Sequence, residues 1–266
     1  MSVTGEAEAE AAGPGGPAAR PWIGLYLSEP ARGLAEFASL WAATPWLSFA
    51  PRGDRHGVLV LPGLLAADSS TAVLRWYLGW LGYDVRGWNL ARNLGPTDRV
   101  LDELPRALAA HAERTGGPVS LIGQSLGGIY ARELGRQQPG LVRQVITLAS
   151  PFALHDTRES RAHGAFQRHA HRHAAAGRVP TREQRASPIE VPSTAVFSRW
   201  DGIVSWQSCV EPETDRHENV EVRCGHLGFG VDPATLWLTA DRLALPAGQW
   251  RPFRPPPALR LLYPRR

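Results

Sequence analysis

The sequence Gly123-Gln-Ser125-Leu126-Gly127 places a serine between two glycines, directly after a short apolar run. A helical pattern follows, so we expect Ser125 to lie on a sharp turn between a strand and a helix. The glycines suit a strained turn in which nearby backbone leaves no room for a Cβ atom. Such a turn exposes the serine oxygen and directs the amide of Leu126 toward the place where an oxyanion would form. Ser125 is therefore a candidate nucleophile.

A serine nucleophile needs a general base, and the base needs an acid that orients it. His226 follows the last apolar run and has glycines close on both sides, whereas the other eight histidines lie elsewhere. Asp201 follows the run before that one, in the sequence Asp-Gly-Ile-Val. Asp215 and Asp232 are weaker candidates, since one lies in a charged loop and the other lies just beyond the histidine. The chain order serine, aspartate, histidine is one of the orders in which catalytic triads occur.

A second donor to an oxyanion is expected in the loop after the first strand, which has the sequence Pro62-Gly63-Leu64-Leu65. Gly63 permits a close approach of the backbone. The amide of Leu64 is the best candidate donor and that of Leu65 is the second. A simple Pro-Gly turn is the alternative interpretation.

The elements that must position these residues alternate between short apolar runs and helix-length segments. Continuous apolar runs separated by helices indicate an α/β fold with an open, doubly wound, mostly parallel sheet. Ligands of such sheets bind beyond the carboxyl ends of the strands. The six predicted strands are 57–61, 83–87, 119–123, 145–149, 193–198 and 220–223, and the helical segments are 71–81, 100–115, 126–138, 206–210 and 233–243.

The connection 152–188 between the fourth and fifth strands is long, polar and rich in arginine and histidine, which predicts a helical lid insertion. Within it, His169 and His173 would share one face of a helix. A metal site there would lack a carboxylate or a third ligand, so we favour a solvated lid helix and expect no metal.

The flanking segments complete the domain organisation. Residues 1–20 are predicted to be disordered, and residues 21–245 to form the domain with its lid. The helical pattern at 29–43 favours packing against the domain over a membrane-binding helix, because its polar face has no basic cluster. The Pro- and Arg-rich tail 246–266 is expected either to wrap the surface through Trp250 and Phe253 or to be partly disordered.

The composition argues against several other classes of protein. The 29 basic residues are all arginine, are scattered among 25 acidic residues and give a net charge of +4, so we expect no nucleic-acid partner. No apolar stretch approaches the ~20 residues that span a membrane. The N-terminal segment has neither the basic nor the apolar region of a secretion signal, which predicts a cytoplasmic location.

The two cysteines, Cys209 and Cys224, lie near the candidate acid and base in the sequence. A disulfide between them would join the two loops. Two free, buried thiols are the favoured alternative for a cytoplasmic protein.

The chain resembles the α/β-hydrolase superfamily, and in particular compact bacterial esterases and lipases, over roughly residues 57–243. The resemblance rests on the four segments described above: the serine turn, the acid loop, the histidine loop and the Pro-Gly loop. It implies Ser125 as nucleophile, His226 as base and Asp201 as orienting acid. The backbone amides of Leu64 and Leu126 would form the oxyanion hole.

Pro62 and Gln124 depart from the family pattern, which often has histidine at both positions, but neither departure removes a catalytic group. In the family, a glycine followed by a bulky apolar residue in the oxyanion loop tends to accompany medium or long acyl substrates. Apolar residues close to the catalytic ones in sequence are candidates for lining an acyl pocket or, equally, for the core. These candidates are Leu65, Phe152, Trp200, Trp206 and Phe229.

We therefore predict a serine hydrolase of the esterase or lipase type that cleaves carboxylic esters through an acyl-enzyme. The expected partner is a small-molecule ester with an apolar acyl group, and no cofactor is expected. An acyltransferase or thioesterase that uses the same acyl-enzyme is the alternative. A non-catalytic, ligand-binding member of the fold is a further one.

Overall fold

The four inner strands form from apolar runs because a parallel sheet covered on both faces buries nearly all of their side chains, whereas the two edge strands contain charged residues. The computed structural model describes residues 19–264, so the prediction for residues 1–20 falls, apart from Ala19 and Arg20, outside them. All strand pairs are parallel, which confirms the predicted sheet, although β4 and β6 begin earlier than expected. The strands are β1 (Gly57–Leu61), β2 (Asp84–Gly87), β3 (Val119–Gln124), β4 (Val142–Leu148), β5 (Ser193–Phe197) and β6 (His217–Glu221).

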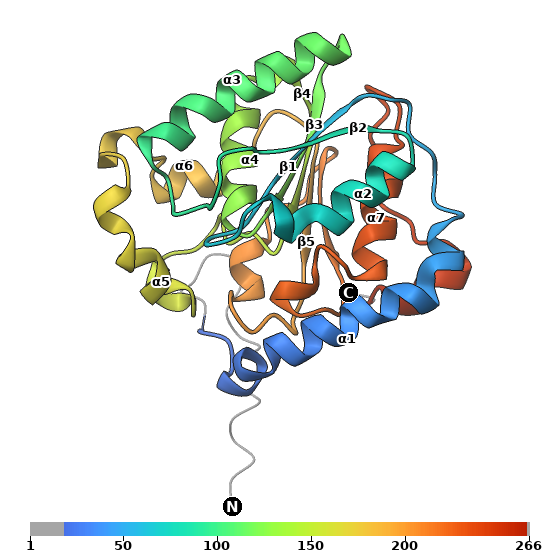
Figure 1. The fold of residues 1–266 in the computed structure, drawn as a ribbon, viewed down its shortest axis with the longest axis horizontal. Coiled ribbons are helices and arrows are strands. Elements are labelled where there is room, and N and C mark those ends of the chain that lie inside the picture. Colours follow the sequence, from blue (N-terminus) through green and yellow to red (C-terminus); the bar gives the residue numbers. More distant parts are fainter. Residues whose placement is uncertain (1–18, 265–266) are drawn as a thin grey trace, which may run out of the picture.

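The strand order is β2-β1-β3-β4-β5-β6 (Figure 1). The chain moves outward in one direction from β1 to β2 and in the other from β3 to β6, so the order reverses between β1 and β3. In the register of these two central strands, Leu61 lies opposite Gly123. The loop after β1 and the turn after β3 therefore leave the sheet side by side, at the point where open α/β sheets bind ligands.

The helices cover both faces of the sheet. Helices α2 and α7 pack on the face that carries Val58, Val60 and Ile122. Helices α3 and α4 pack on the opposite face, against Leu59 and Leu121. The helices are α1 (Ile23–Leu47), α2 (Ala72–Trp80), α3 (Asp98–Thr115), α4 (Leu126–Gln137), α5 (His163–Arg168), α6 (Arg182–Ala186) and α7 (Pro233–Leu243).

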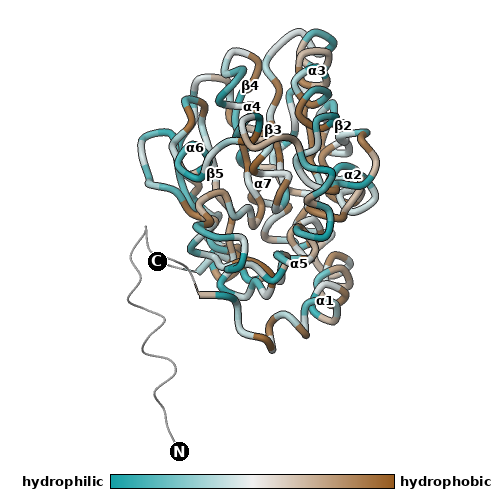
Figure 2. Tube along the Cα trace, turned by 90° about the vertical axis from the view of Figure 1, so that its left-hand side faces the viewer, coloured by the Kyte–Doolittle hydropathy of each residue, from teal (hydrophilic) through white to brown (hydrophobic). Residues whose placement is uncertain are grey.

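Helix α1 is longer than the predicted helical segment and lies across one end of the sheet, at the bottom of Figure 1. It packs against α7 and against the short turn His226–Gly228, which confirms packing on the domain. The helix and the residue before it expose large apolar side chains, including Trp22, Leu27 and Trp41. In Figure 2, hydrophobic and hydrophilic residues alternate along α1. Among the described residues, no helix is both long and apolar enough to cross a membrane.

The insertion between β4 and β5 contains two short helices, α5 and α6, and several 3-10 turns instead of one lid helix. Helix α5 ends at Arg168, so His169 and His173 do not share a helical face, and that expectation is wrong. His173 is partly buried: its ring packs on Phe166 with centroids 4.5 Å apart, and its Nε2 lies 3.0 Å from the Leu94 carbonyl oxygen. Over residues 19–264, no three His, Cys, Asp or Glu side chains are grouped as a metal would require.

The C-terminal tail wraps around the domain as far as residue 264. The amide of Phe253 donates to Glu218 Oε2 at 2.6 Å, and the ring of Phe253 packs edge-on against Tyr263. The hydroxyl of Tyr263 in turn donates to the carbonyl oxygen of Ala234 in α7 at 2.8 Å.

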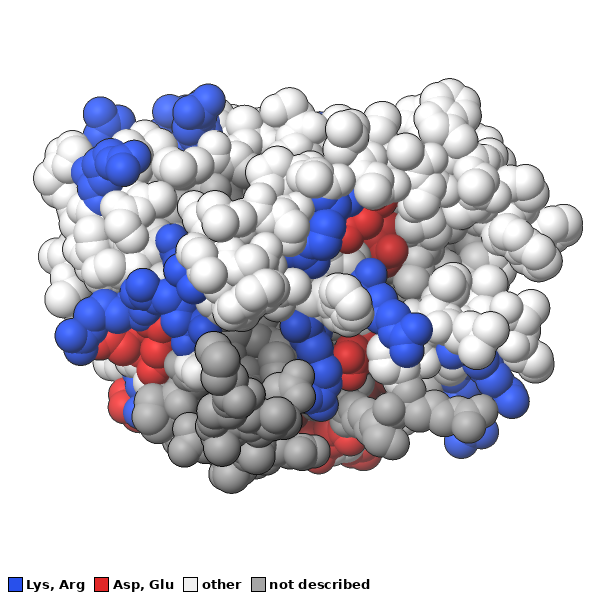
Figure 3. Space-filling view, turned by 90° about the horizontal axis from the view of Figure 1, so that it is seen from below, with Lys and Arg blue, Asp and Glu red and all other residues white. Residues whose placement is uncertain are grey.

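On the face seen from below, the arginines lie in separate groups with uncharged surface between them (Figure 3).

Candidate active site

Ser125 occupies a strained turn between β3 and α4, as the sequence predicts. Its φ of 50° and ψ of −120° define a backbone conformation that residues other than glycine seldom adopt. Three hydrogen bonds hold it: the Ser125 amide donates to Leu148 O at 2.8 Å, and the Ser125 carbonyl accepts from the Ser150 hydroxyl at 2.6 Å and from the Gly128 amide at 3.0 Å. The surrounding sheet therefore imposes the strain that exposes the serine side chain.

The glycines of the turn are required by close backbone approach. A Cβ on Gly123 would lie 2.4 Å from backbone atoms of Gly127, and a Cβ on Gly127 would lie 2.3 Å from Leu61 O. Neither contact can be relieved by moving a side chain, because the facing atoms belong to the backbone. The pattern of small residues around Ser125 thus follows from the packing of α4 against β1 and β3.

Asp201 and His226 are joined by a hydrogen bond of 2.6 Å between Asp201 Oδ2 and His226 Nδ1. The other carboxylate oxygen, Oδ1, accepts from the amides of Ile203 at 2.7 Å and Val204 at 2.8 Å. Both side chains are buried. A histidine that donates through Nδ1 leaves Nε2 as an acceptor, which is the tautomer that a general base needs.

The environment of His226 favours its protonated form. Burial by itself lowers the pKa of His226, but the charge of Asp201, the hydrogen bond to Asp201 and the charge of Glu29 together raise it above the ordinary value. An imidazole in this setting accepts a proton readily and stabilises the resulting imidazolium.

The histidine loop meets the serine turn through Gln124, whose Nε2 donates to His226 O at 3.1 Å. Within residues 19–264, no hydrogen bond joins Ser125 Oγ to His226. In enzymes without bound substrate, such contacts are often long and tighten only when substrate binds.

The Pro-Gly loop after β1 approaches Ser125 closely. A Cβ built on Gly63 would lie 3.2 Å from Ser125 Cβ and 3.9 Å from Ser125 Oγ. The amide of Leu65 already donates to Asn93 O at 2.7 Å, so it is not available to a substrate. Leu64 and Leu126 line the same cavity as Ser125, so their amides are the candidate donors of an oxyanion hole.

A cavity of about 140 Å³ lies beside Ser125, between the start of α4 and the insertion. Its lining is mostly apolar and includes Leu101, Ile129, Phe166 and Val179, in addition to Leu64 and Leu126.

The five residues proposed from the sequence as pocket lining are not in the wall of this cavity. Phe152 and Phe229 are fully buried in the core, and Arg132 lies over the Phe152 ring. Trp206 stacks on Phe197 in the core, and the side chain of Trp200 is half-exposed. Leu65 is partly buried, and its amide is bound to Asn93 O. Proximity to the catalytic residues in the chain was a poor guide to the cavity wall. Residues at strand ends also pack in the core, and the insertion supplies much of the wall.

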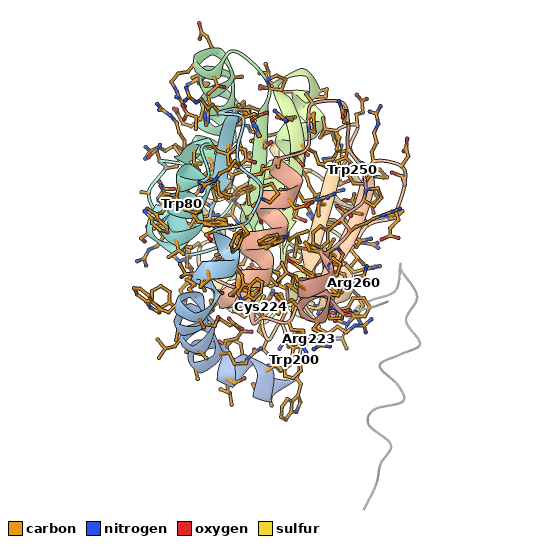
Figure 4. The ribbon with its side chains drawn as sticks, turned by 90° about the vertical axis from the view of Figure 1, so that its right-hand side faces the viewer. Trp80, Trp200, Arg223, Cys224, Trp250 and Arg260 are labelled. Carbon is orange, nitrogen blue, oxygen red and sulfur yellow. The ribbon has the colours of Figure 1, made fainter. Side chains whose placement is uncertain are left out.

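The rival candidates have other positions. Asp215 is exposed in a surface loop. Asp232 caps the start of α7, where its carboxylate accepts from the amide and the hydroxyl of Thr235. Cys209 and Cys224 are both free and buried, and burial raises the pKa of each thiol; Cys224 lies above α1 in Figure 4.

Three residues that the sequence did not identify support these loops. Asn93, fully buried, donates from its side chain to Pro62 O at 2.9 Å and so holds the Pro-Gly loop. Glu29 and Glu36 reach from α1 to amides of the acid and histidine loops. The partners of Glu29 and Glu36 lie far away in the chain, so no local sequence pattern identifies these two residues. The one feature that could have indicated them is a charged residue on the apolar side of a helix.

No family model and no curated protein sequence matches the chain. Among solved structures, it is similar to lipase B of Aspergillus fumigatus, with a TM-score of 0.56 and 17% identity. That match covers 71% of this chain and 52% of the lipase, so the chain spans about half of the lipase's length. It also resembles a thioesterase domain of the curacin biosynthetic pathway, with TM-score 0.48, 15% identity and coverage of 72% of this chain and 92% of that domain.

A pyrethroid hydrolase is similar at a TM-score of 0.48 and 17% identity, over 73% of this chain and 99% of the hydrolase. At these identities the comparisons concern the fold. The lipase match, at a TM-score of 0.56, supports a shared fold, to which the all-parallel six-stranded sheet of this chain belongs. The chain therefore has the α/β-hydrolase fold.

Proposed function

We propose that this protein is a serine hydrolase that cleaves carboxylic esters, with Ser125 as nucleophile, His226 as base and Asp201 as orienting acid. The observation that carries the proposal is the buried 2.6 Å hydrogen bond between Asp201 and His226, which leaves Nε2 as an acceptor. The backbone of His226 is in turn bound by Gln124, the residue directly before Ser125 on its strained turn. Burying a carboxylate–imidazole pair costs free energy, and ionisable groups with a shifted pKa, such as His226, cluster at functional sites.

The reaction would proceed in two halves. Ser125 Oγ adds to the ester carbonyl carbon while its proton passes to His226 Nε2, and the amides of Leu64 and Leu126 hold the resulting oxyanion. The bond to the alcohol then breaks, and the alcohol leaves with the proton from His226. Water then gives a proton to His226 as its oxygen adds to the acyl carbon. The bond to Ser125 Oγ breaks, His226 returns the proton to Oγ, and the carboxylic acid leaves.

The cavity limits the acyl group. Apolar cavities of about 150 Å³ hold a molecule of the size of benzene, and the cavity beside Ser125 is about 140 Å³. An apolar acyl group of about six carbon atoms therefore fits inside, and a longer chain must extend past the insertion. We expect kcat/KM for a series of nitrophenyl esters to peak at short to medium chains.

The decisive experiment combines labelling with mutation. Wild-type protein should react with a fluorophosphonate probe at Ser125, and Ser125→Ala should lose both the label and several orders of magnitude in the rate of aryl-ester hydrolysis. The variant Ser69→Ala, at an exposed serine, is the matched control. A Ser125→Ala protein that hydrolyses the ester at the wild-type rate would overturn the proposal.

A further inference from the structure

Helix α1 inserts a buried carboxylate between the acid loop and the histidine loop. Glu29 is only 2% exposed, and its charge is partly balanced by Arg32, one turn further along the helix at 2.7 Å. The remaining hydrogen bonds to its oxygens come from backbone amides: Gly202 at 2.8 Å, His226 at 3.0 Å and Leu227 at 3.1 Å. Hydrogen bonds from amides to a buried carboxylate are among the stronger ones in proteins. One side chain thus binds both loops directly.

The contacts of α1 bracket Asp201 on both sides in the chain. Glu29 holds the amide of Gly202, and Arg32 Nη1 donates to Trp200 O at 2.6 Å. Trp200 lies at the end of α1 in Figure 4. Asp201, between these two anchored residues, has little freedom to turn away from His226.

His226 is bracketed in the same way. Its own amide and that of Leu227 bind Glu29, while the preceding amide, of Gly225, donates to Glu36 at 2.7 Å. Glu29 and Glu36 are two helical turns apart and therefore face the loops together.

Glycines in both loops accommodate the helix. A Cβ on Gly202 would lie 2.5 Å from the backbone of Leu25 in α1, and one on Gly225 would lie 2.8 Å from Glu29 Oε2. Gly202 is needed because the backbone of α1 approaches it closely, and Gly225 leaves room for the Glu29 carboxylate. The fit indicates a permanent part of the site, since a loosely attached helix would not require it.

We infer that Glu29 is a positioning residue for the Asp201–His226 pair, and that α1 belongs to the catalytic apparatus although it precedes the sheet in the chain. Glu29 contacts the backbone of both loops and does not line the cavity beside Ser125. It should therefore affect the chemical step and leave substrate binding unchanged. The inference rests on the proposed function for its kinetic consequences, but the position and titration of His226 can be observed without any substrate.

Charge gives a second consequence. The histidine loop is contacted by Asp201 from the acid loop and by Glu29 and Glu36 from α1. Arg32 pairs with Glu29, and the charge of Asp232 at the start of α7 helps to raise the pKa of Glu36. The charge of Glu29 helps to raise the pKa of His226. Replacing that charge with an amide should therefore lower the pKa, and the rising limb of the pH–rate profile should move to lower pH.

The test is Glu29→Gln, compared with Glu103→Gln, which breaks an exposed Glu–Arg pair of the same spacing on α3. For Glu29→Gln we expect kcat to fall by about 10²-fold with KM unchanged, because small misplacements of catalytic groups have effects of that size. NMR titration of His226 should show a lowered pKa in Glu29→Gln and an unchanged one in Glu103→Gln. Wild-type kcat together with wild-type titration in Glu29→Gln would overturn the inference.

The variant Glu29→Asp separates position from charge and serves if Glu29→Gln does not fold. It keeps the carboxylate but shortens the reach, so we expect a loss of kcat with the His226 titration close to wild type. Full kcat in this variant would contradict the positioning role. If Ser125 fails to label while the NMR result holds, the proposed function is wrong and the role of Glu29 toward His226 stands.

Discussion

Replacing Asp201 by asparagine should reverse the tautomer of His226. Two amides, of Ile203 and Val204, donate to Asp201 Oδ1, so the asparagine carbonyl oxygen must take this place. Its NH₂ group then occupies the position of Oδ2, 2.6 Å from His226 Nδ1 in the wild-type protein. A donor there forces Nδ1 to become an acceptor and moves the ring proton to Nε2, which can no longer accept the serine proton.

The size of the effect follows from the loss of the base. The same change in the serine-protease triad lowers kcat by about 10⁴-fold, which corresponds to about 5 kcal/mol of transition-state stabilisation. We expect a loss of this order in kcat for an aryl ester, measured over a range of pH, with the fold intact by circular dichroism. The packing of the loop should not change, because aspartate and asparagine have the same shape.

The matched control is Asp215→Asn, which removes the same charge at an exposed position. It should hydrolyse the ester at the wild-type rate. If Asp201→Asn kept more than about a tenth of the wild-type kcat, the argument from the fixed acceptor side of Asp201 would be wrong, and another group would have to orient His226.

Three further outcomes follow from the structure. Gly127→Ala should prevent correct folding, seen as a large drop in melting temperature, because its Cβ would lie 2.3 Å from Leu61 O. Arg132→Met should reduce the free energy of unfolding by about 3–5 kcal/mol, because Glu211, the buried partner of Arg132 at 2.8 Å, loses the charge of the arginine. Denaturant titration measures this loss, and adding Glu211→Leu should restore much of it. Burial raises the pKa of Glu36 from 4.5 to about 7, against the opposing effect of its hydrogen bond from a backbone amide. The folded state therefore binds this proton more tightly than the unfolded chain, so the free energy of unfolding should fall as pH rises from 4.5 to about 7. Urea unfolding on either side of this range should show the fall in the wild type and a smaller one in Glu36→Gln.

Much of the fold could be predicted because its signals are local. The strands at Gly57–Leu61 and Val119–Gln124 are continuous apolar runs, and the turn at Ser125 is marked by glycines on both sides. The hydrogen-bonded pair Asp201 and His226 was found from chain order, since the ends of neighbouring parallel strands meet at one edge of the sheet.

What could not be predicted depends on contacts between distant segments. All six strands lie between Glu29 and His226 in the chain, and nothing near Glu29 in the sequence indicates what it binds. The prediction of the residues that line the cavity failed for a related reason. Phe166 and Val179 come from an insertion whose path is set by its contacts with the domain. The periodicity of apolar residues identifies a helix or strand, but it does not identify the surface against which that element packs.

The position of α1 bears on where the functional unit begins. All strands and the three proposed triad residues lie between Gly57 and Asp232, so a domain boundary drawn from the sheet alone would start at β1. Such a boundary would discard Glu29 and Arg32 and leave the amides of Gly202 and His226 without their acceptor. A transplanted or fused version of this module should therefore carry α1 with it.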